Sequence, residues 1–122
     1  MNEQFLQLAK LKTNLADIIV LYMSQAGNLN YLGNILSQII RTDTPTIIIG
    51  DFNVNFLDEK TKSSSFLKKQ SLVKLVNVPT HIEGSCLDQA LVRDQQKMNT
   101  YHIQLVSKYY TDHKAITLII RR

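Results

Sequence analysis

Two apolar runs rich in β-branched residues flank one amphipathic helix pattern, and this order constrains the fold more than any other feature. Residues 18–22 and 46–49 are typical of buried strands, and the apolar positions within 31–40 repeat with the i, i+4 spacing of a helix. Asn28 is placed to cap that helix, and Pro45 pushes the chain out of the helical region. The result is a strand, helix, strand unit. If its strands are parallel, we expect a right-handed crossover and an α/β fold.

Further segments extend this unit into a mixed sheet with flanking helices. Residues 5–9 are expected to form a hairpin with the first buried strand, across a polar turn at 12–14. Residues 58–65 are polar and indicate a loop, and a short helix is expected around 66–69. Later strands are predicted at 72–78, 87–92, 101–105 and 116–120.

Length and composition limit the classes of protein to consider. The 122 residues, 44% apolar and 20% charged, predict one globular domain. Cys86 is the single cysteine, which excludes an internal disulfide and favours a reducing, intracellular location, including the nucleus. The apolar run 18–23 is far shorter than the roughly 20 residues of a membrane helix, so no membrane association is expected. A formal charge of +4 slightly favours a polyanionic partner.

Polar side chains stand at the ends of three predicted strands. Each group, taken singly, is explained by an ordinary turn. Together they supply what hydrolysis of a phosphodiester needs: carboxylates for a divalent cation and a base, and an amide and an imidazole for the phosphate oxygens. The residues are Asp51, Asn53, Asp88, Asp112 and His113.

The histidine needs a partner that fixes its orientation and charge. A carboxylate within about 4 to 6 Å favours the protonated imidazole, and Asp88 is the expected partner of His113. Every plausible ligand for a cation here is an oxygen, so Mg²⁺ is preferred over zinc.

Three segments resemble the C-terminal signatures of the endonuclease/exonuclease/phosphatase superfamily, written GDFN, T followed by LD, and SDH. They are "IIIGDFNVNF", "PTHIEGSCLDQALV" and "YYTDHKAI", in the family's order. The pattern is most similar to the endonuclease domains of retrotransposons. The resemblance covers residues 5–120 and implies the C-terminal half of a two-sheet, DNase I-like α/β sandwich. Residues 1–122 would then be one partial domain that lacks the N-terminal half.

The resemblance implies a role for each matching position. Asp51 would position or deprotonate the attacking water, and Asn53 would bind the scissile phosphate. Tyr22, at the end of an upstream strand, would point at the phosphate.

The remaining roles fall on the second and third signatures. Asp88 would hydrogen-bond the catalytic His113, which contacts the phosphate, and Asp112 would lie near the metal. The implied metal ligands are Asp51 and Asp112, for Mg²⁺ or Mn²⁺.

The chain also departs from the family pattern. Family members are about twice as long, and their N-terminal half supplies an Asn and a Glu to the metal; this chain has no counterpart. His81 stands where Arg is common after Thr, Gln89 where His or Tyr is usual, and Thr111 replaces Ser. A sheet built to pack on another would expose an apolar face, which predicts self-association.

The expected function is Mg²⁺-dependent phosphodiester hydrolysis on DNA, impaired in this chain. Two alternatives stay open. One is a catalytically inactive mobile-element remnant or interaction module, and the other is a phosphoinositide or other lipid phosphatase of the same superfamily.

Overall fold

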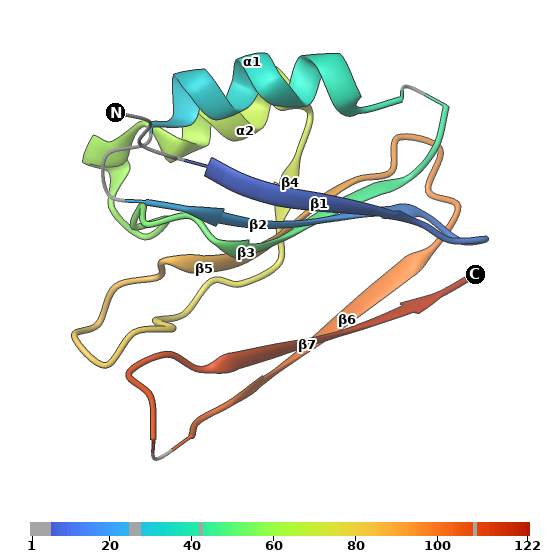
Figure 1. The fold of residues 1–122 in the computed structure, drawn as a ribbon. Coiled ribbons are helices and arrows are strands. Elements are labelled where there is room, and N and C mark those ends of the chain that lie inside the picture. The colour runs from blue at the N-terminus through green and yellow to red at the C-terminus, as the bar shows by residue number, and fades with distance from the viewer. Residues whose placement is uncertain (1–5, 25–27, 42, 109) are drawn as a thin grey trace.

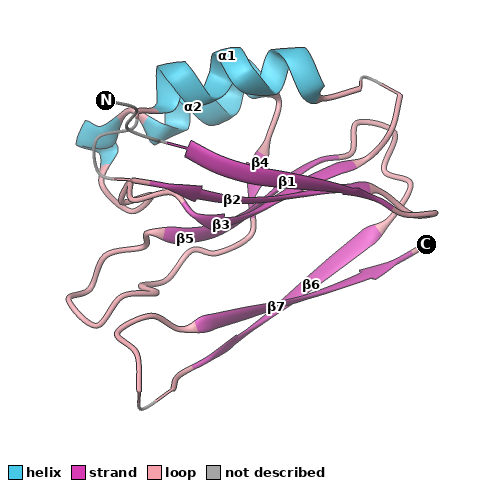
Figure 2. Ribbon diagram, viewed as in Figure 1, coloured by secondary structure: helices cyan, strands magenta, loops and turns pink. Residues whose placement is uncertain are grey.

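The computed structural model describes residues 6–24, 28–41, 43–108 and 110–122, and it forms three layers (Figures 1 and 2). Two helices cover one face of a five-stranded mixed sheet, and a two-stranded sheet covers part of the other face. The large sheet has the order β1-β2-β3-β5-β4. Its strands are β1 (Leu6–Lys12), β2 (Asp17–Met23), β3 (Thr46–Asp51), β5 (Asp88–Arg93) and β4 (Val73–Lys74). The other elements are α1 (Leu29–Ile39), a 3₁₀ turn η1 (Glu59–Thr61), α2 (Ser63–Gln70), β6 (Thr100–Val106) and β7 (Ala115–Arg121).

The strand, helix, strand unit predicted from the sequence is confirmed. β2 and β3 are parallel, and β1 forms the expected antiparallel hairpin with β2. The Asn28 side chain caps α1 by accepting the Tyr31 N–H at 2.8 Å. Phe5, the first residue of the predicted hairpin, lies outside the described residues.

The helix-covered face holds the main core. Alternate residues of the central strands, such as Ile19, Ile48 and Leu91, are fully buried there against α1 and α2. Leu32 of α1 is fully buried, and Phe66 of α2 is nearly so. Because strand side chains alternate between faces, the intervening residues of the same strands point away from the helices.

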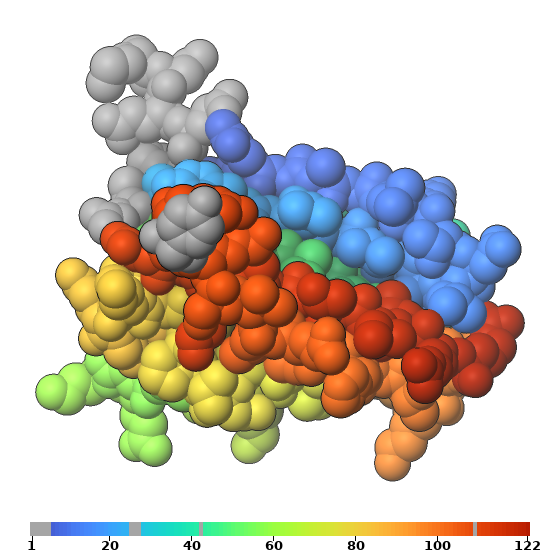
Figure 3. Space-filling model, turned by 90° about the horizontal axis from the view of Figure 1, so that it is seen from below, coloured from blue at the N-terminus to red at the C-terminus, as the bar shows by residue number. Residues whose placement is uncertain are grey.

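The opposite face is only partly covered. On β3 and β5, Ile47 and Val92 pack against residues of the β6–β7 sheet, such as Leu118. On β1 and β2, Leu11 and Val20 remain exposed, at 60% and 53% of their surface. Figure 3 shows this face, with β1 and β2 in blue beside the orange and red strands. On this face of the large sheet the exposed apolar surface is therefore that of β1 and β2, because β6 and β7 cover β3 and β5.

Two predicted segments differ from the structure in extent, while the helix expected around 66–69 is present as α2. The strand at 72–78 is reduced to β4, because the buried Gln89 side chain takes over the backbone pairing that a longer strand would make. Its Oε1 accepts the Val76 N–H at 2.8 Å, and its Nε2 donates to the Val76 carbonyl at 2.9 Å. The loop predicted at 58–65 contains η1 and the start of α2, separated by Lys62 in the left-handed conformation.

No helix in the described parts of the chain is long and apolar enough to cross a membrane.

Candidate active site at the ends of β2, β3 and β5

At one edge of the large sheet β2 and β3 end and β5 begins. Each of these neighbouring strands places one predicted residue there, and the three residues form a row across the strands. Tyr22 of β2 lies opposite Asp51 of β3, which in turn lies opposite Asp88 of β5. All three share the face that carries Ile47 and Val92, because each is an even number of residues from a residue of that face. Cross-strand neighbours have Cβ atoms about 5 Å apart, so the row places a phenol and two carboxylates within reach of one ligand.

Gly50 brings the end of β3 unusually close to β2. Its φ is +155°, and a Cβ at this position would lie 1.9 Å from the Leu21 carbonyl oxygen. A side chain would therefore force the two strands apart just before Asp51. The glycine of the GDFN segment sets the position of the carboxylate through close backbone packing.

The turn after β3 holds Asn53 in a fixed position. Asn53 has a φ of +51°, and its backbone N–H donates to Asp51 Oδ1 at 2.9 Å. Its side-chain Nδ2 donates to the Met23 carbonyl at 2.5 Å, which ties the turn to the end of β2. An amide nitrogen carries two N–H groups, so this bond leaves Asn53 a second donor.

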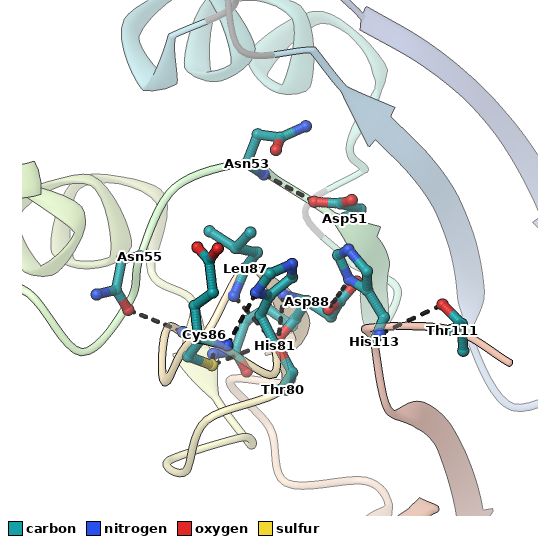
Figure 4. Close-up of polar contacts among 12 residues, drawn as sticks. Asp51, Asn53, Asn55, Thr80, His81, Cys86, Leu87, Asp88, Thr111 and His113 are labelled. Atoms are coloured by element: carbon teal, nitrogen blue, oxygen red, sulfur yellow. Dashed lines mark hydrogen bonds and ion pairs between the residues drawn. The ribbon is translucent and has the colours of Figure 1, made fainter. Parts of the chain in front are cut away.

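His113 reaches the row from the loop before β7. Its Nδ1 lies 2.7 Å from Asp88 Oδ2, the contact predicted from the sequence. This hydrogen bond raises the pKa of His113 above its ordinary value, and the charges of Asp88 and Asp51 add to the effect while burial opposes it. With Nδ1 fixed on Asp88, the other ring nitrogen is presented to a ligand. Figure 4 shows Asp51, Asp88 and His113 turned toward one another.

Thr80 holds Asp88 in place from below. The threonine is buried, and its Oγ1 accepts the backbone N–H groups of Leu87 at 3.2 Å and Asp88 at 3.1 Å. The T and LD parts of the second signature are therefore joined by direct hydrogen bonds. Asn55, two residues after Asn53, accepts the Cys86 N–H at 2.8 Å and ties the turn after β3 to the same loop.

Asp51 has the environment of a weakly acidic carboxyl group. Burial raises the pKa of Asp51, and the charge of Asp88 raises it further, while the Asn53 N–H and the imidazoles of His113 and His81 act in the opposite direction. A carboxylate with a raised pKa is a better proton acceptor, which suits a group that orients or deprotonates water.

The carboxylates of this site form a possible binding group for a divalent cation. Ligand atoms of Asp51, Asp88 and His113 lie within 4.8 Å of one another. Asp88 Oδ2 is already engaged by His113, so Asp51 is the carboxylate best placed to bind a cation. One or two carboxylates, completed by water and phosphate oxygens, are a common environment for Mg²⁺. Asp112, the other predicted ligand, is exposed and lies outside this group of three.

One residue near the row was given no role by the sequence. The rings of His81 and His113 meet edge to face, with centroids 4.9 Å apart and an interplanar angle of 85°. The sequence signal that could have pointed to His81 was its position directly after Thr80, where Arg is common in the family that the chain resembles. Tyr22 is 48% exposed, so its ring is accessible from the same side as the carboxylates.

No protein-family model matches the sequence, and a search of curated proteins finds no match. Solved structures do resemble it. The endonuclease domain of TRAS1, a telomere-specific non-LTR retrotransposon, is 16% identical, with a TM-score of 0.68 over 96% of this chain and 61% of that domain. The cytolethal distending toxin from Actinobacillus actinomycetemcomitans is 15% identical, with a TM-score of 0.68 over 94% of this chain and 53% of the other.

An endonuclease/exonuclease/phosphatase family protein from Leptotrichia buccalis is 11% identical, with a TM-score of 0.62 over 96% of this chain and 54% of the other. The chain therefore has the DNase I-like fold of the endonuclease/exonuclease/phosphatase superfamily. It spans about half to three fifths of the length of these structures.

Proposed function

We propose that this chain is part of a Mg²⁺-dependent phosphodiesterase that cleaves DNA. The observation that carries the proposal is the row of Tyr22, Asp51 and Asp88, completed by the 2.7 Å bond from Asp88 to His113. The same four positions match the signature residues of the superfamily whose fold the chain has. The spans of the matched structures support the reading of residues 1–122 as one partial domain of that superfamily.

Each residue has a step that its surroundings allow. Asp51 orients a water molecule and takes its proton as the water oxygen bonds to phosphorus, and its raised pKa favours this proton transfer. The P–O bond to the leaving sugar oxygen breaks in the same step, and that oxygen takes up a proton from solvent. His113, kept protonated by Asp88, donates from Nε2 to a nonbridging phosphate oxygen as negative charge builds there. Asn53 offers its second amide N–H to the same phosphate. A Mg²⁺ ion would be held by Asp51 and would neutralise phosphate charge.

A groove beside the site supports a polymeric anion as the substrate. It has a volume of about 1050 Å³, lies between α1 and α2 on the helix-covered side of the large sheet, and reaches the site at Asn53. Lys62 and Lys69 line it together with several amides and hydroxyls, and none of the described residues that line it is acidic. A phosphate backbone leaving the site could lie along such a surface, because lysines attract it and amides bind it. A small phosphate ester would make no use of it.

The test is the conversion of supercoiled plasmid to the nicked form by the purified chain with Mg²⁺. We expect slow nicking that is lost in His113→Ala and in Asp51→Asn, while His102→Ala, on the exposed side of β6, behaves as the wild type. Nicking equal in the wild type and His113→Ala would refute the proposed chemistry.

A second candidate is a phosphate-binding module without turnover. It is favoured by one observation: in the described residues the site gathers Asp51 and the Asp88–His113 pair, while Asp112 lies apart. This candidate predicts that the chain binds plasmid but does not nick it. The phosphatase alternative predicts the release of phosphate from a phosphoinositide, with no effect on plasmid.

A further inference from the structure

A second imidazole lies beside the Asp88–His113 pair, and the proposed function leaves it unused. His81 comes from the loop between β4 and β5, far from His113 in sequence. Their backbones form an isolated antiparallel bridge, and their rings meet edge to face at 4.9 Å. The two histidines are thus neighbours through both main chain and side chain.

The loop that carries His81 is firmly attached on both sides. Its own turn is closed by hydrogen bonds from Thr80 N and His81 N to the Ser85 carbonyl, both at 3.0 Å. The loop before β7 is tied to it by Ile82 N donating to the Asp112 carbonyl at 2.9 Å and Lys114 N donating to the Thr80 carbonyl at 2.8 Å. Because these hydrogen bonds already fix the loop, the His81 ring loses little further conformational entropy when it binds a ligand.

The hydrogen bonding of His81 fixes the position of its proton. Nδ1 lies 3.2 Å from the Glu83 backbone N–H and accepts from it. In the neutral ring the proton must then reside on Nε2, so the free end of the ring is a donor. In Figure 4 the His81 and His113 rings extend to the same side, toward Asp51 and Asn53.

We propose that His81 is a second phosphate ligand of this site, whose Nε2–H donates to a nonbridging oxygen of the phosphodiester that His113 contacts. The inference rests on the proposed function and adds a substrate-contacting residue to it. A bound phosphodiester is an anion next to the carboxylates of Asp51 and Asp88, so it needs several donors to be held there. His81 supplies one from the side of the 80–87 loop, as Asn53 does from the turn after β3.

Binding is tested on the wild-type chain by NMR of the histidine ring nitrogens. The spectrum of the free protein should show the Nε2–H form of His81, because Nδ1 accepts from the Glu83 N–H. Dimethyl phosphate, a minimal diester, is then added with Mg²⁺. We expect the Nε2–H signals of His81 and His113 to shift together with one saturation curve, while exposed His102 on β6 stays unchanged.

The functional test uses hydrolysis of bis(4-nitrophenyl) phosphate. Loss of one hydrogen bond to a charged group should lower kcat/KM of His81→Ala by about 10- to 100-fold. His81→Gln, whose Nε2 can take the place of the ring donor, should recover part of this loss, whereas a purely structural role would not depend on that donor. His102→Ala is the matched control.

The outcomes separate the two proposals. Activity that depends on His113 but not on His81, or a His81 signal that ignores dimethyl phosphate, would overturn the inference and leave the proposed function standing. If the wild type lacks turnover, the proposed catalysis fails, and the NMR titration of the wild type still decides whether His81 binds the diester.

Discussion

Gly50→Ala gives the sharpest test of how the site is built, because a single methyl group would enter a place already filled by backbone. The new Cβ would lie 1.9 Å from the Leu21 carbonyl oxygen and 2.8 Å from its carbonyl carbon. Cβ atoms essentially never approach within 3.0 Å, so β2 and β3 must separate by about 1.1 Å at this point. No flexible side chain is available to absorb the displacement, because the contacted atoms belong to a central strand.

The expected cost follows from two terms. Overpacking in a filled interior costs about 1–3 kcal/mol. An alanine held at a φ of +155° adds backbone strain of about 1–3 kcal/mol. The free energy of unfolding should therefore fall by about 2–6 kcal/mol, a large part of the typical 5–15 kcal/mol. A displacement of about 1 Å next to Asp51 should also lower any phosphodiesterase rate by about 100-fold.

Urea denaturation followed by circular dichroism measures the change, with Gly84→Ala as the matched control. Gly84 has a φ of +94°, but a Cβ there would meet nothing within 4 Å. The control therefore carries the backbone strain without the clash, and the difference between the variants isolates the clash. The reasoning is refuted if Gly50→Ala unfolds within about 1 kcal/mol of the wild type, or if both variants lose the same amount.

Three further predictions concern other parts of the chain. Because the pKa of His113 is raised in the folded state, its bond to Asp88 stabilises the protein fully at pH values below about 6.5. This stabilisation is lost as the pH rises through the folded-state pKa. The gap in free energy of unfolding between the wild type and Asp88→Asn should shrink by up to about 1 kcal/mol from pH 6 to pH 9, since the pair is partly exposed; a growing gap would contradict this. Gln89→Leu leaves the Val76 N–H and carbonyl without their side-chain partner and should lower the free energy of unfolding in urea by about 2–4 kcal/mol. The exposed control Gln95→Leu should change it little. We propose that the uncovered β1–β2 face supports self-association, so Val20→Lys should lower the apparent mass in sedimentation; an unchanged mass would exclude this face.

The sequence predicted best those elements whose side-chain pattern and backbone pairing agree. The 18–22 and 46–49 strands and the helix between them follow from periodicity and from local stop signals such as Pro45. The strand predicted at 72–78 failed because one distant side chain, Gln89, competes for its hydrogen bonds, and nothing in the local sequence shows this.

Contacts within the candidate site could be predicted from the sequence only between residues that belong to recognised motifs. The Asp88–His113 contact could be expected because the histidine needs a carboxylate partner and because both residues match signatures of one family. His81 could not, because its place depends on how the 80–87 loop bonds to the loop before β7. The position of Asp112 outside the group of three likewise depends on loop geometry that periodicity does not report.

The bonds that Gln89 makes to Val76 also affect how this protein meets other molecules of its kind. β4 is an outer strand of the large sheet, and it pairs for only two residues before the glutamine takes over. Unpaired strand edges invite pairing with another chain and are starting points for aggregation. The Gln89 side chain bonds both the N–H and the carbonyl of Val76, so β4 ends before this residue. Edge strands are often blocked by a charged residue or a proline, and position 76 has neither. Gln89→Leu should therefore reveal a tendency to aggregate in addition to its loss of stability.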